Sequence, residues 1–116
     1  MSPREGEERR RSKRVPLQLS GRYMLENGGE YRCQTQYVSL SGILLRGFPA
    51  GKVGEWVVAY LDHLGRVEGT IVRSADAWFV FEIAAPTVKM EKLATQIESL
   101  SAARALLSSG LTKVAA

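Results

Sequence analysis

Five cationic side chains crowd into six consecutive residues, immediately before the first apolar stretch of the sequence. They are Arg9, Arg10, Arg11, Lys13 and Arg14. An arginine presents a planar guanidinium that can grip a phosphate through two parallel hydrogen bonds and can also stack flat on a base. Arg10 and Arg14 stand four residues apart, so together they could close over one face of a purine-bearing anion. The charges from Arg4 to Glu8 are typical of a solvated charge run instead.

A second group of small polar residues lies in the segment YVSLSG, from Tyr37 to Gly42. Ser39 and Ser41 offer compact hydroxyl donors, and Gly42 permits close approach of the backbone to a ligand. Alone, such a segment is typical of a corner between two strands. Together with the arginine pair it indicates a site for a compact guanine-containing dinucleotide, in preference to a long polymer.

The sequence contains no arrangement of residues that indicates catalysis. His63 is the only histidine and lies in a DHLG turn, while Cys33 is the only cysteine and lies in a strand pattern that favours a core position. A glycine-rich phosphate loop of the GxxxxGK type is missing. We therefore predict a binding or interaction module that is not an enzyme and has no metal site and no cofactor. The lone thiol also excludes an intrachain disulfide and fits a reducing compartment.

Length and charge narrow the class of protein further. The 116 residues suit one domain, and residues 1–14 carry six cations against three acids, so most of the net charge of +4 lies in that segment. A nearly neutral body argues against binding to a nucleic-acid polymer. The sequence has no apolar run of about 18–20 residues that could span a membrane, and no secretory signal. A cytoplasmic protein is expected.

Apolar alternation with a period of two predicts a mainly β fold. The expected strands are residues 15–25, 31–38, 43–45, 54–62, 66–74 and 77–83. Asn27-Gly28-Gly29, His63-Leu64-Gly65 and Ala75-Asp76 supply turns between them. Six short strands with this spacing favour a six-stranded antiparallel β-barrel, because closure removes the exposed edges.

After the last predicted strand, apolar residues recur every three or four positions instead of every second position. Met90, Leu93, Ile97 and Leu100 form a stripe that predicts a helix from Val88 to about Leu107, ending before Ser108. We expect this helix to lie on the barrel, with pairing to a second copy as the alternative. The predicted organisation is a flexible, disordered basic segment (1–14), a barrel (15–85), a C-terminal α-helix (86–109) and a frayed tail (110–116).

The two polar motifs, in this order on this architecture, resemble the PilZ domain family, the bacterial receptors for cyclic di-GMP. The RxxxR element of the family is matched by Arg10 and Arg14, and its [D/N]xSxxG element is matched at Ser39 and Gly42. The resemblance covers about residues 8 to 85. It implies that the two arginines clamp the phosphates and stack on guanine, with Arg9 as a further phosphate contact. It also implies that Ser39 and Gly42 lie against the base edge, with Ser41 beside them.

Tyr37 departs from the pattern, because the family has Asp or Asn at this position. The resemblance implies a hydrogen bond from that side chain to guanine, which a phenol does not reproduce, although the ring could stack or donate through its hydroxyl. Losing one such bond costs about 1–3 kcal/mol, or about one to two decades of affinity. The leading hypothesis is a single-domain cyclic di-GMP receptor that signals to an unknown protein partner in motility, adhesion or exopolysaccharide control.

Two other functions stay open. One is a PilZ-like protein-interaction module that has lost nucleotide binding because of Tyr37. The other is a barrel that binds RNA or single-stranded DNA, suggested by a pI of about 9.5 and by Trp56, Tyr60 and Trp78. The last is the weakest, because these aromatic residues lie in apolar strand runs where core packing is expected.

Overall fold

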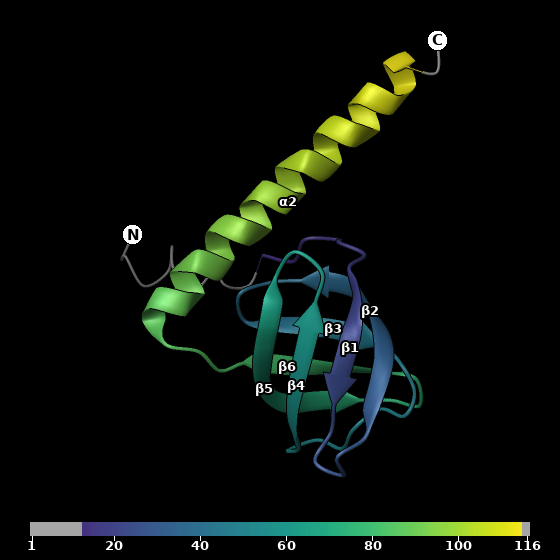
Figure 1. Ribbon diagram of the computed structural model, residues 1–116, viewed down its shortest axis with the longest axis vertical. Helices are drawn as coiled ribbons and strands as arrows, with labels where there is room; N and C mark the ends of the chain where they lie inside the picture. Colours follow the sequence, from purple (N-terminus) through teal and green to yellow (C-terminus); the bar gives the residue numbers. More distant parts are fainter. Residues whose placement is uncertain (1–12, 115–116) are drawn as a thin grey trace.

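Six antiparallel strands form a closed barrel in the computed structural model, which describes residues 13–114 (Figure 1). The strands are β1 (Ser20–Met24), β2 (Glu30–Val38), β3 (Gly42–Arg46), β4 (Trp56–Leu61), β5 (Gly65–Ser74) and β6 (Trp78–Ile83). Their order around the barrel is β1-β2-β3-β6-β5-β4, and β1 pairs with β4 to close it. The predicted six-stranded antiparallel barrel is confirmed.

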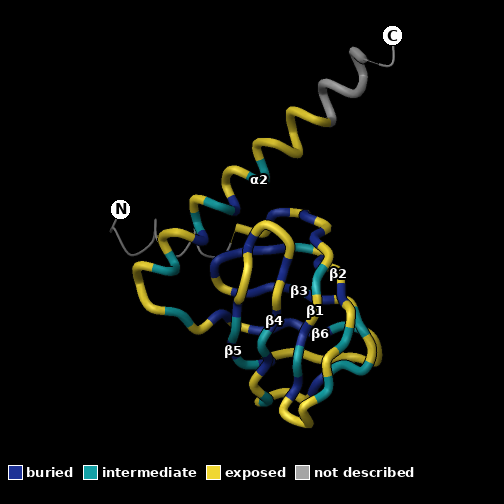
Figure 2. Tube along the Cα trace, viewed as in Figure 1, coloured by how far each residue is buried: buried dark blue, intermediate teal, exposed yellow. Residues whose placement is uncertain are grey.

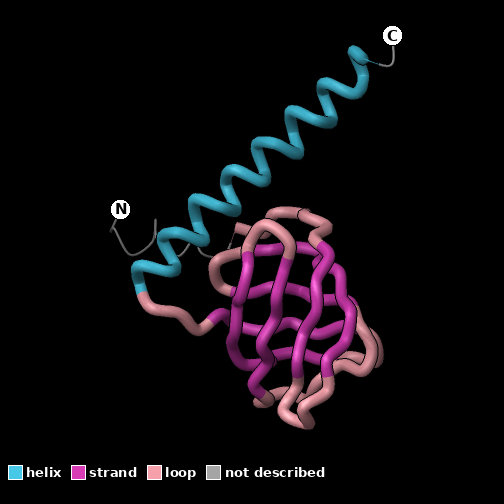
Figure 3. Tube along the Cα trace, in the orientation of Figure 1, coloured by secondary structure: helices cyan, strands magenta, loops and turns pink. Residues whose placement is uncertain are grey.

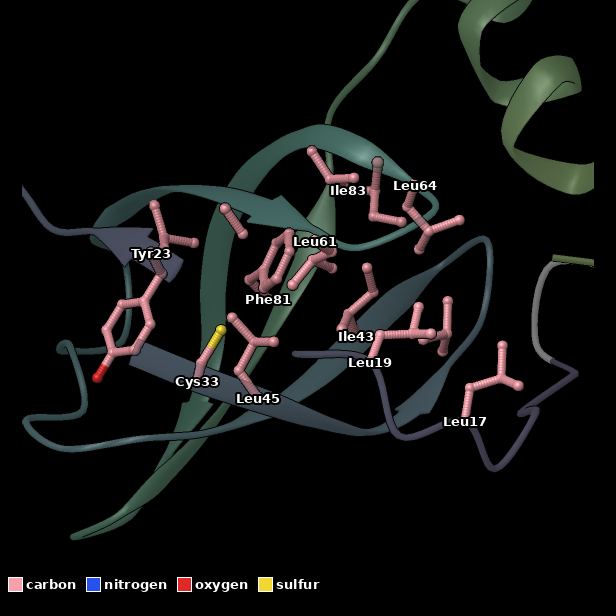
Figure 4. Close-up of a cluster of buried hydrophobic side chains, with 14 of the residues drawn as sticks. Leu17, Leu19, Tyr23, Cys33, Ile43, Leu45, Leu61, Leu64, Phe81 and Ile83 are labelled. Carbon is pink, nitrogen blue, oxygen red and sulfur yellow. The ribbon is translucent and has the colours of Figure 1, made fainter. Parts of the chain in front are cut away.

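The core fills the inside of the barrel with side chains from alternate strand positions. Its largest fully buried members are Tyr23, Phe79, Phe81, Ile43, Leu45 and Ile71 from the strands and Leu93 from the helix that follows them. Figure 4 shows part of this cluster, with Leu17 and Leu19 from the segment before β1 among the strand residues. The N-terminal segment is therefore part of the packed domain from Val15 onward.

The first strand begins later than the alternation predicts. Val15, Leu17 and Leu19 are buried, as a strand from residue 15 would require, but only Val15 pairs in strand fashion, through a bridge to Val38. The physical reason is a mismatch in length: five steps along the chain lead from Val15 to Ser20, but only four lead from Gln34 to Val38, their partners on β2, so a regular ladder cannot run through the segment. The Thr35 side chain supplies hydrogen bonds to this segment in place of a regular ladder. The Leu19 N–H donates to Thr35 Oγ1 at 2.8 Å, and Thr35 Oγ1 donates to the Leu17 carbonyl at 2.6 Å.

One long helix, α2 (Thr87–Val114), follows the barrel and lies across one end of it, against the β4–β5 turn and the β2–β3 corner (Figure 1). Leu93 and Ile97 are buried in the core, whereas residues 102–107 are exposed. The far part of the helix projects past the strands (Figures 2 and 3). The described residues contain no helix long and apolar enough to cross a bilayer.

The predicted end of the helix before Ser108 is wrong, because α2 continues to Val114. Residues 110–114, expected as a frayed tail, are thus helical, while 115–116 lie outside the described residues. A single glycine inside a helix costs only about 1 kcal/mol relative to alanine, and no proline follows Gly110 to stop the helix. Serine and glycine mark a helix end only when the backbone also turns there.

The expectation that Trp56 and Tyr60 pack in the core is also wrong. Their side chains are 39% and 45% exposed on the outer face of β4, and Trp78 is only half-buried. In the run WVVAYL every second residue is buried: Val57, Ala59 and Leu61 point inward, and the residues between them point outward. Arg22 of β1 and Arg66 of β5 are the register neighbours of Tyr60.

Two buried side chains, the Cys33 thiol and the Tyr23 hydroxyl, have raised pKa values and stay protonated well above neutral pH. Burial raises the pKa of the Cys33 thiol to about 12. Burial, followed by the nearby Cys33 and Tyr31, raises the pKa of Tyr23 to about 12. The Tyr23 hydroxyl donates to the Pro49 carbonyl at 2.7 Å. Cys33 is a buried free thiol, as its strand position predicted.

Thr35→Val is expected to lower the free energy of unfolding by about 2–4 kcal/mol, because it leaves the buried Leu19 N–H and Leu17 carbonyl each without this partner. Urea unfolding followed by circular dichroism measures the change. Thr35→Ser keeps the hydroxyl and serves as the control, with a smaller loss from the missing methyl group. Equal losses in the two variants would contradict the role given to the hydroxyl.

Stability is expected to fall in mild alkali, because the unfolded chain releases the Cys33 proton first. Below about pH 8 this thiol is protonated in both states and has no effect. Above its ordinary pKa of 9.0, one such group contributes a fall of about 1.4 kcal/mol per pH unit until its folded pKa is reached. Cys33→Ala should show a smaller drop in unfolding free energy between about pH 8 and about pH 10 than the wild type. Tyr23 still titrates in the variant, so part of the drop remains. Parallel pH profiles would contradict the assignment.

Candidate ligand-binding site

The two sequence motifs meet through Arg14 and Tyr37. The Arg14 guanidinium carbon lies 4.9 Å from the centroid of the Tyr37 ring, a cation–π contact. Tyr37 is half-buried and Arg14 is exposed. Arg9 and Arg10 lie outside the described residues. The structure thus brings together the second arginine of RxxxR and the first position of the second motif.

A β-bulge gives Tyr37 its direction. The pairing of β2 with β3 shifts between Thr35, which faces Leu45, and Tyr37, which faces Leu44. The extra residue on β2 breaks the alternation, so that Thr35 and Val38 are both buried and Tyr37 between them turns outward. A regular strand over residues 31–38 would put Tyr37 on the same, buried face as Thr35. The Val15–Val38 bridge then carries the neighbouring Arg14 alongside.

Ser39 and Gly42 form the corner between β2 and β3. The Ser39 hydroxyl accepts the Gly42 N–H at 3.0 Å and donates to the Gly42 carbonyl at 2.9 Å, and the Ser41 hydroxyl lies 3.1 Å away. Ser39 is only 3% exposed, so its hydroxyl holds the corner in shape, whereas Ser41 is exposed. A Cβ on Gly42 would stand 3.1 Å from the Phe81 carbonyl, so a glycine permits close packing of β3 on β6.

A groove of about 300 Å³ runs between the N-terminal segment, this corner and α2. Its walls are mainly small or apolar: Val15, Leu40, Ala94, Ile97, Ala102 and Ala105. Lys13, Ser39, Glu98 and Ser101 supply the polar groups. The sequence did not predict that α2 lines this groove. The buried stripe of Leu93 and Ile97 places Glu98 on the flank of the packed face, but only the docked helix shows what Glu98 is next to.

A larger groove, of about 730 Å³, lies on the opposite flank of α2. It is lined by residues 16–19, Gln36, His63 and residues 100–107 of the helix, and it contains none of the predicted site residues that the structure describes. His63 is exposed in the β4–β5 turn. Among the described residues, no three His, Cys, Asp or Glu side chains come together as a metal site would need. The smaller groove is the one that adjoins the motifs.

Comparisons with known proteins agree with this architecture. The family model of the PilZ domain matches residues 8–99. The fold is similar to the crystal structure of the PilZ domain of CeSA from a cellulose-synthesizing bacterium, with a TM-score of 0.60 and 16% sequence identity over 78% of this chain and 95% of that one. At this identity the likeness shows the fold alone. No curated protein matches the sequence.

The family model covers most of the chain, including both polar motifs, the whole barrel and the first half of α2. The family is one of binding and receptor modules. The chain belongs to the PilZ domain family, a family of receptors for cyclic di-GMP.

Proposed function

We propose that this chain is a single-domain cyclic di-GMP receptor that signals to a protein partner. The observation that carries the proposal is the contact of Arg14 with Tyr37, which joins two motifs that lie over twenty residues apart in the sequence. Because the contact uses one face of the guanidinium, the other face is available to stack on a guanine base. The N–H groups at the guanidinium edge can at the same time bind phosphate.

Tyr37 supports the clamp in this arrangement. A cation–π contact at an exposed site is worth about 0.5–1 kcal/mol, whereas a hydrogen bond to a charged group is worth about 1.5–3 kcal/mol. The ring therefore orients Arg14 before binding but does not hold it strongly enough to compete with a phosphate. Arg10, four residues earlier, supplies the second guanidinium and Arg9 a further phosphate contact, while Ser41 and the backbone at Gly42 border the base.

Ligand binding would draw residues 8–14 onto the barrel, and the new surface would engage or release a protein in motility, adhesion or exopolysaccharide control. The neutral body and charged N-terminal segment support this division of roles, because the segment carries the phosphate-binding groups and the barrel carries the framework. In this proposal the protein is cytoplasmic, needs no metal and catalyses no reaction.

Arg10→Ala and Arg14→Ala are each expected to weaken cyclic di-GMP binding by about tenfold or more, because each removes charge-assisted hydrogen bonds to phosphate. Fluorescence anisotropy of labelled cyclic di-GMP measures the affinity. Arg73→Ala, on the exposed part of β5, is the matched control and should bind as the wild type does. Full binding by both motif variants would show that the site is misassigned, and no binding by the wild type would refute the receptor function.

A second candidate is an interaction module without nucleotide binding. Two observations favour it. Tyr37 stands where the family has Asp or Asn, and Trp56 and Tyr60 are exposed on β4, with Tyr60 between Arg22 and Arg66. Tryptophan, tyrosine and arginine are the residues that most often dominate protein–protein binding energy. In this case the outer face of β4 would contact the partner whether or not a nucleotide is present.

Tyr37→Asn separates the two candidates. For a receptor, the amide restores a hydrogen bond to guanine and should tighten binding by about tenfold over a wild type that already binds. For an interaction module, binding should be undetectable in the wild type and appear only in the variant. Isothermal titration measures both, with Tyr60→Asn as the control for replacing an exposed tyrosine. Weaker binding by Tyr37→Asn would contradict the receptor account of the missing hydrogen bond.

A further inference from the structure

The groove between the N-terminal segment and α2 has the chemistry of a nucleobase site. A base has two apolar faces and a polar edge, and sites for such ligands are mostly apolar with a few convergent polar groups. Ala94, Ile97 and Ala102 of the helix form a wall of this kind, with Val15 and Leu40 on the barrel side. The volume of about 300 Å³ is at the lower end of small-molecule sites, so it suits one base and not a whole dinucleotide.

The polar groups of the groove have opposite charges. Lys13 contributes a cation from the segment that carries the arginine clamp, and Glu98 contributes a carboxylate from α2. Glu98 is exposed and takes part in neither of the two ion pairs that connect described residues, Arg22–Glu30 and Arg66–Glu68. Ser101 lies one turn further along the helix and adds a hydroxyl. A ligand with anionic phosphates and a hydrogen-bond-donating base would match both the Lys13 cation and the Glu98 carboxylate.

We propose that Glu98 recognises the edge of one guanine of cyclic di-GMP, the base that does not stack on Arg14. Guanine presents its N1–H and N2 amino donors side by side, and the two oxygens of a carboxylate accept from both. Adenine offers an acceptor at N1 and a single amino donor, so the same carboxylate disfavours it. This inference rests on the proposed receptor function and names the residue that sets its base specificity.

The position of Glu98 also fits the division of the ligand between two surfaces. The guanidinium of Arg14 stacks on one base, while the second base enters the groove beside Lys13, the residue directly before Arg14. The phosphates then lie near the cationic segment that separates the two positions. Helix α2 thereby becomes part of the binding site.

The test compares Glu98→Ala with Glu91→Ala in the full chain, by isothermal titration of cyclic di-GMP and of cyclic di-AMP. Glu91 lies two helical turns earlier on the same exposed flank and does not line the groove, so its variant removes the same charge from the same helix. Glu98→Ala should bind cyclic di-GMP about tenfold or more weakly and should lose preference over cyclic di-AMP, whereas Glu91→Ala should be unchanged.

Whether Glu98→Ala weakens or tightens binding distinguishes recognition of the base from a pure charge effect. If Glu98 acted only through its charge, its removal would tighten binding of the dianionic ligand, because the carboxylate repels the phosphates. Unchanged or tighter binding by Glu98→Ala, or an equal loss for both dinucleotides, would overturn the inference while leaving the receptor function intact. No binding by the wild type would refute the receptor function itself. Thermal unfolding of each variant checks that α2 remains docked.

Discussion

The hydroxyl of Thr35 is the constraint on which the position of the candidate site depends. It is fully buried and has two partners on the segment before β1, the Leu19 N–H and the Leu17 carbonyl. That segment has one residue more than the stretch of β2 opposite it and cannot pair regularly, so these two bonds, the bond from the Thr35 N–H to the Leu19 carbonyl at 2.8 Å and the Val15–Val38 bridge hold it in place. Because Lys13 and Arg14 directly precede the anchored residues, the same bonds decide where the cationic segment enters the barrel.

The candidate site consists of parts from three distant regions of the chain. The anchored segment brings Arg14, the bulge in β2 brings Tyr37, and the packing of Leu93 and Ile97 brings the exposed flank of α2. Each part is positioned by apolar burial or backbone pairing, and the polar groups remain at the surface between them. Ser39 is the exception, since its hydroxyl stabilises the corner itself. The shape of this corner therefore depends on a polar side chain as well as on apolar packing.

Much of the fold could be predicted because strand alternation and turn residues are local signals. The six strands, the hairpin turns and the start of the helix, predicted at Val88 and observed at Thr87, follow from them, although β1 begins later than predicted. The bulge at Gln36 could not be predicted, because no glycine or proline marks it. Trp56 and Tyr60 were misplaced because an all-apolar run does not reveal which alternate positions face outward. The end of α2 and the groove at Glu98 depend on tertiary packing, which no local pattern contains.

The most direct test of the account is a titration of cyclic di-GMP followed by amide proton–nitrogen correlation spectra of the labelled protein, because it reports binding and its location together. A cyclic di-GMP receptor with this site should show saturable shifts at Arg14, Tyr37, the corner from Ser39 to Gly42 and the helix around Glu98, with cyclic di-AMP producing weaker ones. An unchanged spectrum, or shifts confined to the outer face of β4 around Trp56 and Tyr60, would contradict it.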